Sequence, residues 1–270
     1  MCFICGSSIG SVRDIVPRAI LSAFVLFWLL PELPAASELE KPSNMPPTQH
    51  VFERLLPSSA LHVGMHVDEL EEAIRSRYSD WERSERKRPL NNRKGISLSP
   101  EAQSAYLQTI SISHEDEAQK LTFKYNFVLT SPLTGSRIYS IVYRVEADTS
   151  ALISVGDWAN ALHSRWGNEH GGIRSDARAR ATYFFDAEWR LIEDAGNKCA
   201  PIYPAFYRLD EKTIDEVTAV SKVLDATGCA FSRDSALAIK EGAAVQSIFY
   251  TVDFRLQVND VLKRVAFGLQ

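Results

Sequence analysis

The sequence predicts an α+β fold, with antiparallel sheets and helices packed on one face. Runs of strand-like segments, with an apolar residue at every second position, follow one another along the chain. Segments with apolar residues at spacings of three and four, typical of amphipathic helices, precede these runs. The order helix, strands, helix, strands suggests two similar α+β units, at 51–148 and 149–270.

A helix is predicted over 64–81. Its apolar stripe consists of Val67, Leu70, Ile74, Tyr78 and Trp81. His66 stands at the N-cap position and Glu69 follows three residues later, which is a capping box with histidine in place of the usual serine or threonine. Acidic residues gather early in this helix and arginines late, as the helix dipole favours.

Strands are predicted next over 105–113, 120–130 and 137–145. The middle segment alternates apolar residues with Thr122, Lys124 and Asn126, so one of its faces is wet. The turn-forming cluster 131–136 joins it to the third segment, and together they predict a β-hairpin.

In the second unit, Ser154 caps a helix that carries Trp158, Leu162 and Trp166, and Gly167 ends it. Strands are then predicted at 181–187, 190–193 and 202–208, a helix at 213–225 and a strand at 245–256. Asn259 is expected to cap a short last helix that ends at Phe267. Phe249 falls on the otherwise polar face of its strand, so we expect it to be an exposed contact residue.

The N-terminal segment predicts export from the cytosol. Arg13 and Arg18 precede the apolar run 19–30, and the small residues 35–37 follow it, so 1–37 is a signal peptide cleaved before Glu38. The run of about 12 residues is shorter than the roughly 20 of a spanning helix, and an uncleaved anchor is the alternative. The polar, proline-rich segment 38–50 is a flexible leader. We expect a periplasmic or secreted protein.

Two cysteines remain after the signal peptide, Cys199 and Cys229. In an oxidising compartment an even pair favours a disulfide over two buried thiols. The bridge would close a loop of about 30 residues and stabilise the fold by roughly 3 kcal/mol. Neither cysteine has a nearby histidine, so a catalytic thiol is disfavoured.

The net charge of −4 gives no electrostatic case for nucleic-acid binding. The one basic segment, 83–94, is predicted to be a solvated loop, and binding of phosphate or a lipid headgroup is its alternative.

The start of the first helix, Gly64-Met65-x-x-x-Glu69-Leu70, resembles that of two groups of proteins, the SmpA/BamE-type outer-membrane assembly lipoproteins and the beta-lactamase-inhibitor-like domains. With the pairs Trp166-Gly167 and Gly228-Cys229, it also resembles secreted proteobacterial proteins of the same helix-then-strands organisation. The resemblance implies helix-and-sheet modules that bind proteins, and so an envelope protein as partner.

Two histidine-containing groups are candidates for a reactive site. His62 and His66 are four residues apart, but no His-Glu-x-x-His pattern completes a zinc site. Asp157, His163 and His170 combine acid and base types and carry the alternative hypothesis of a hydrolase or metal-dependent enzyme. We assign no catalytic, cofactor-binding or metal residue.

The sequence therefore favours an exported periplasmic protein that acts as a non-enzymatic binding or interaction module of the cell envelope. We expect no cofactor and no nucleic-acid partner. The membrane would be contacted only through the N-terminal signal, if this stays uncleaved.

Overall fold

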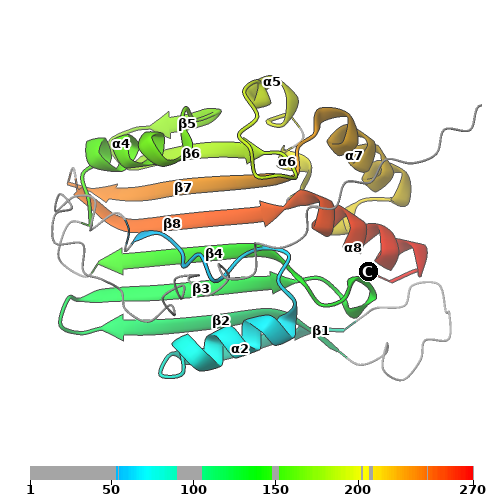
Figure 1. Ribbon diagram of the computed structural model, residues 1–270, viewed down its shortest axis with the longest axis horizontal. Helices are drawn as coiled ribbons and strands as arrows, with labels where there is room; N and C mark the ends of the chain where they lie inside the picture. The colour runs from blue at the N-terminus through cyan, green and yellow to red at the C-terminus, as the bar shows by residue number, and fades with distance from the viewer. Residues whose placement is uncertain are drawn as a thin grey trace, which may run out of the picture. The chain divides into compact units, whose positions relative to one another are not determined.

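Eight antiparallel strands form one continuous sheet in the order β1-β2-β3-β4-β8-β7-β6-β5 (Figure 1). The computed structural model describes residues 53, 55–89, 105–147, 152–201, 203–206, 209–241 and 243–269. The strands are β1 (Glu82–Arg88), β2 (Tyr106–Asp116), β3 (Leu121–Leu129), β4 (Ile138–Ala147), β5 (Gly171–Arg174), β6 (Arg178–Phe185), β7 (Phe231–Lys240) and β8 (Ala243–Asp253). The predicted α+β class with antiparallel pairing is confirmed.

Helices connect and flank the strands. They are α2 (Val67–Arg77), α4 (Val155–Trp166), α5 (Ala195–Lys198), α6 (Tyr203–Phe206), α7 (Ile214–Thr227) and α8 (Phe254–Ala266), with 3-10 turns η1 (Pro132–Thr134) and η2 (Leu209–Glu211). Within the described ranges, no helix combines the length and apolarity needed to cross a membrane. The predicted signal peptide 1–37 and leader 38–50 lie outside the described residues.

The predicted helix starts are confirmed for α2 and α4. The His66 imidazole accepts a hydrogen bond from the Asp68 amide at 3.3 Å, while Glu69 accepts one from the His66 amide at 2.8 Å. These two contacts form the capping box at the start of α2. Ser154 Oγ likewise accepts from the Asp157 amide at 3.0 Å and caps α4.

The C-terminal helix begins earlier than the sequence predicted. Strand β8 ends at Asp253, whose carboxylate accepts a hydrogen bond from the Leu256 amide at 2.8 Å and caps α8. The predicted strand end at 256 and the predicted cap at Asn259 are therefore wrong. Phe254 continues the alternation of the strand but also begins the buried helical stripe Phe254, Val258 and Val261.

Other strands differ from the prediction as well. The segment 190–193 has only the isolated bridge between Phe185 and Leu191, and the segment 202–208 contains the helix α6. Strands β5 and β7 were not predicted, and the basic segment 83–94, predicted as a loop, contributes most of the exposed edge strand β1. An edge strand rich in charges is protected against pairing with other chains, and it lacks the apolar alternation by which strands are recognised.

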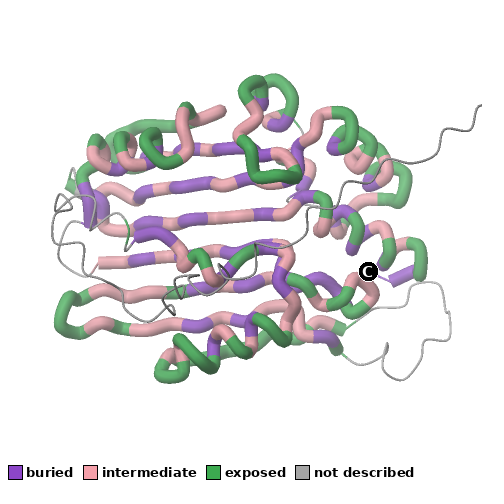
Figure 2. Tube along the Cα trace, viewed as in Figure 1, coloured by how far each residue is buried: buried purple, intermediate pink, exposed green. Residues whose placement is uncertain are grey.

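One face of the sheet packs against α2 and α4. Cross-strand neighbours share a face, and the row Tyr125, Tyr143, Phe249 belongs to the same core cluster as Leu70 of α2 and Trp158 of α4. Buried segments alternate along the strands in Figure 2. Phe249 is only 3% exposed, so its predicted role as an exposed contact is wrong. The face of β8 that carries Ser247 and Phe249 looks polar in the sequence but is the one packed into the core.

The opposite face is covered at one end by α7 and α8. Phe184 and Val252, which point to this face, join Val217 of α7 and Val258 of α8 in a second core cluster. The predicted disulfide lies in this cluster: Cys199 and Cys229 are bonded, with Cα atoms 6.0 Å apart. Such a bridge is compatible with an oxidising, extracytoplasmic location.

Each half of the chain supplies one opening helix and four antiparallel strands: α2 with β1 to β4, and α4 with β5 to β8. The halves join where β4 pairs with β8. The larger core cluster runs beneath both opening helices. A duplication behind this similarity stays a prediction.

Candidate ligand cavity

A cavity of about 880 Å³ lies on the sheet face opposite to α2 and α4. Its floor consists of side chains from β2, β3, β4 and β8, and its walls come from β1 on one side and from α6, η2 and α8 on the other. The lining residues are Arg86, Lys87, Arg88, Pro89, Gln108, Val128, Tyr139, Ser140, Val142, Tyr203, Phe206, Leu209, Asp210, Glu211, Tyr250, Val252, Phe254 and Gln257.

Two β-bulges direct additional side chains into the cavity. Along β2, Thr109 pairs with Arg86 and Leu107 pairs with Lys87, so Gln108 between them has no cross-strand partner. Along β4, Ile138 and Ser140 pair with successive residues of β3, and Tyr139 is the extra residue. A bulge interrupts the alternation of faces and re-aims a side chain, and both extra residues line the cavity.

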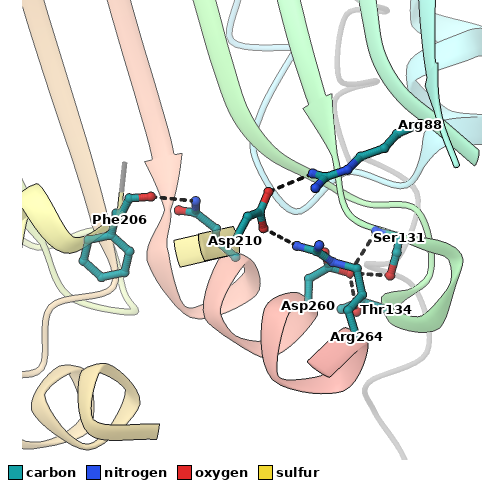
Figure 3. Close-up of polar contacts among 8 residues, drawn as sticks. Arg88, Ser131, Thr134, Phe206, Asp210, Asp260 and Arg264 are labelled. Atoms are coloured by element: carbon teal, nitrogen blue, oxygen red, sulfur yellow. Dashed lines mark hydrogen bonds and ion pairs between the residues drawn. The ribbon is translucent and has the colours of Figure 1, made fainter. Parts of the chain in front are cut away.

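A chain of charged side chains holds the wall together (Figure 3). Asp260 on α8 accepts hydrogen bonds from the Ser131 amide and hydroxyl and from Thr134, which fixes the β3–β4 turn to the helix. Its other oxygen accepts from Arg264 at 2.9 Å.

Arg264 also donates to Asp210 of η2 at 2.5 Å. Asp210 in turn accepts from Arg88 of β1 at 2.8 Å. Four segments far apart in sequence are thereby connected: the β3–β4 turn, α8, η2 and β1. The side chains of Asp260 and Arg264 are 4% and 5% exposed, so this part of the network is shielded from solvent.

The charges in this network are mutually stabilised. Burial alone would raise the pKa of Asp210, but the charge and hydrogen bond of Arg264, together with Arg88, outweigh burial and lower the pKa below its usual value. Burial alone would lower the pKa of Arg264, and the charges of Asp210 and Asp260 raise it instead. Asp210 and Arg264 are therefore both charged at neutral pH.

The rim of the cavity carries cations that the network does not use. Arg86 and Lys87 are exposed, and in the described part of the chain neither forms an ion pair. Glu211 is the one lining carboxylate outside the network. With Arg88 and Asp210 paired to each other, two positive charges face one negative charge, so the cavity mouth favours an anion.

Apolar and polar side chains are mixed on the cavity surface, and Ser140 lies between Val128 and Val252 on the floor. Val128, Val142, Val252, Phe206 and Phe254 provide an apolar surface. Burial, and next the charge of Asp210, raises the pKa of Tyr139, so its hydroxyl stays a neutral hydrogen-bond donor.

Within the described part of the chain, two buried polar atoms of the cavity-lining residues, Ser140 Oγ and Gln257 Oε1, lack a hydrogen-bond partner. An unpaired buried polar atom is costly, and a water molecule or ligand group would satisfy it. The cavity therefore fits a ligand with an anionic end, an apolar body and hydrogen-bonding groups.

The three residues of the hydrolase hypothesis make separate contacts. Asp157 accepts from the Ser154 hydroxyl at 2.7 Å at the start of α4, and His163 is exposed in the last turn of the same helix. Six residues of α-helix separate them by about 9 Å along the axis. Among the described residues no group of three or more His, Cys, Asp or Glu could hold a metal ion.

His170 has a structural role. Its Nδ1 accepts a hydrogen bond from the Phe184 amide at 3.0 Å, which ties the start of β5 to β6. Burial lowers the pKa of His170, and a backbone hydrogen bond with Ile192 opposes this only in part. The ring is therefore neutral at pH 7, and it satisfies backbone groups instead of facing Asp157 or His163.

The chain matches no protein-family model, and neither a curated protein nor a solved structure matches it. The geometry of the cavity is therefore the basis for a functional proposal.

Proposed function

We propose that the protein is an exported, non-enzymatic binding protein of the cell envelope, and that the cavity on its sheet binds a small amphipathic anion. The cavity itself carries this proposal. Its volume of about 880 Å³ is within the range of sites for small molecules. Unpaired cations at its rim and apolar side chains on its floor define the two ends of the ligand.

The way the cavity is built supports a ligand-binding site and not merely an empty space in the fold. The two β-bulges direct Tyr139 and Gln108 to its surface. The network from Asp260 to Arg88 fixes three of its walls before any ligand binds. A site whose walls are fixed in advance loses little conformational entropy on binding. An interaction with an envelope protein, which the sequence resemblance implies, stays a separate proposal.

A fluorescent anion tests the proposal. Anilinonaphthalenesulfonate combines a sulfonate with apolar rings, and we expect saturable binding to the native chain at pH 7. Decanoate should displace it, whereas decanol, which lacks the charge, should displace it at least tenfold less effectively. Val142→Phe fills the cavity floor and should abolish binding. Equal displacement by decanol and decanoate would contradict the anionic part of the proposal.

Three matched variants distinguish binding by the rim cations from non-specific electrostatic attraction. Arg86→Met and Lys87→Met remove one rim cation each and should weaken decanoate binding severalfold. Lys124→Met removes an exposed cation from the same sheet face outside the cavity lining and should leave binding unchanged. Equal effects of all three variants would point to non-specific attraction.

Export has its own measurement. The mass of the protein isolated from the producing cells should correspond to a chain that starts at Glu38. A chain that retains residues 1–37 would replace the cleaved signal with an anchor and leave the cavity proposal intact.

A further inference from the structure

A second, smaller pocket lies on the other face of the sheet, beside α4. It has a volume of about 160 Å³ and lies between the segment 56–63 and the strands β4, β7 and β8. Arg233 of β7 lines it in a cross-strand row with Thr251 and Ile141, which places the guanidinium on the face that α4 covers. This pocket shares no lining residue with the large cavity.

Aromatic rings surround the Arg233 guanidinium. Its Cζ lies 4.6 Å from the ring centroid of Trp189, 5.4 Å from Trp166 and 5.7 Å from Phe185. Aromatic faces attract a cation but do not accept its five N–H donors as carboxylates do. Among the described residues, Arg233 forms no ion pair or hydrogen bond to a carboxylate. Burial, and next the charge of Arg165, lowers its pKa to about 10, so it stays protonated at neutral pH.

The backbone conformation of Trp189 indicates that its ring is held in place before any ligand binds. Its φ of 61° lies in the left-handed region, which is unfavourable for a bulky residue. The turn that holds it is fixed by Asp186, whose carboxylate accepts from the Glu188 and Arg190 amides at 2.9 Å. Strained residues held in place by their surroundings gather at ligand sites. The ring also stacks on Phe231 at 4.0 Å, which fixes it beside Arg233.

We propose that this pocket binds the carboxylate of an aromatic or similarly flat apolar acid, with Arg233 pairing the carboxylate and Trp166, Trp189 and Phe249 contacting the apolar body. Arg165 provides a second cation at the pocket, although Glu53 already pairs with it at 2.8 Å. A cavity of about 150 Å³ is sufficient to hold benzene, so a single ring fits here. An incoming carboxylate would give the guanidinium the bidentate partner that the described residues do not supply.

Tryptophan fluorescence provides a local readout, because Trp166 and Trp189 line this pocket and no tryptophan lines the large cavity. Benzoate should change the fluorescence saturably, and neutral benzamide should bind at least tenfold more weakly. Arg233→Met should weaken benzoate binding at least tenfold. Arg86→Met, in the other cavity, is the matched control and should leave it unchanged.

Two further measurements keep the proposal testable if Arg233→Met folds poorly. Arg233→Lys keeps the charge but loses the bidentate geometry, and it should weaken benzoate binding severalfold. Benzoate should also raise the melting temperature of the unaltered protein more than benzamide does. No saturable response to benzoate, an equal response to benzamide, or dependence on Arg86 in place of Arg233 would overturn the proposal.

Discussion

Arg264 and Asp210 form an ion pair with 2.5 Å between Nη2 and Oδ1, and this contact joins the C-terminal helix to the turn η2. The same guanidinium donates to Asp260 one helical turn away, so a single arginine bridges two carboxylates at the wall of the large cavity. The arrangement has consequences for stability, for its pH dependence and for ligand binding.

Replacing Arg264 should be among the most destabilising changes in the chain. Arg264→Met would leave Asp260 and Asp210 without their shared partner, and breaking a buried pair in this way costs about 3–5 kcal/mol. Urea unfolding followed by circular dichroism measures the loss. Arg75→Met, which removes an exposed partner of Glu72, should change the free energy of unfolding by less than about 0.5 kcal/mol.

Acid should selectively weaken the contacts of Asp210. Its pKa is lower in the folded protein than the unfolded value of 3.8, so the charged carboxylate stabilises the fold at neutral pH. This stabilisation is fully present from about one pH unit above the unfolded pKa of 3.8. It is lost as the pH falls through the pKa of the folded protein. The difference in unfolding free energy between the unaltered protein and Asp210→Asn should be constant from pH 7 to about 5 and shrink below about 4. A difference independent of pH would contradict the assignment.

Asp253, the N-cap of α8, should have the opposite effect on the pH dependence of stability. Burial raises the pKa of Asp253, and the hydrogen bonds from the Leu256 and Arg255 amides offset only part of that effect. Its charge therefore opposes folding at neutral pH, and this penalty disappears as the pH falls below the unfolded pKa. Asp253→Asn keeps a good cap and should raise the melting temperature at pH 7. Asp253→Ala loses the cap and should cost about 1 kcal/mol.

Tyr139 should contribute to ligand affinity with little effect on folding. Tyr139→Phe removes the hydroxyl that the β4 bulge directs to the cavity while the ring remains. We expect decanoate binding to weaken about fivefold, which corresponds to one hydrogen bond of about 1 kcal/mol. Competition with anilinonaphthalenesulfonate measures this change, and unchanged affinity would remove Tyr139 from the site.

Removing the disulfide should lower stability by about 3 kcal/mol on the chain-entropy model. The double variant Cys199→Ser, Cys229→Ser measures this without unpaired thiols. Both sulfur atoms lie in the core cluster of α7 and α8, so polar hydroxyls in their place add to the loss. Intact-mass analysis of alkylated protein should show these two cysteines reacting only after reduction.

The elements predicted most closely are those with one buried and one wet face. The alternation in β3 and the stripe in α2 have clear periods because each packs on a single side. Strand β7 was missed because both of its faces are covered and it buries Ser232, Asp234 and Ser235 where apolar residues are expected. Strand β1 was missed for the opposite reason, since it is an exposed edge without an apolar face.

The cavity could not be predicted from local patterns. Its residues come from separate segments, and the two bulges that aim Gln108 and Tyr139 are set by cross-strand register. Asp260 and Arg264, four residues apart, have the spacing of an ordinary surface pair. At 100° per residue the two side chains fall beside the apolar stripe of Val258, Val261 and Val265 and not on it, so the helical pattern carries no local sign that they are buried.

The segment between the two bonded cysteines includes residues that line the large cavity. Tyr203, Phe206, Leu209, Asp210 and Glu211, which form one wall of the large cavity, all lie between Cys199 and Cys229 in the sequence. The disulfide thus joins the two ends of the segment that forms this wall of the large cavity. In the reduced chain the ion pairs of Asp210 would still hold this wall, but its two ends would no longer be joined covalently. The bond therefore constrains the shape of the cavity as well as the core around it.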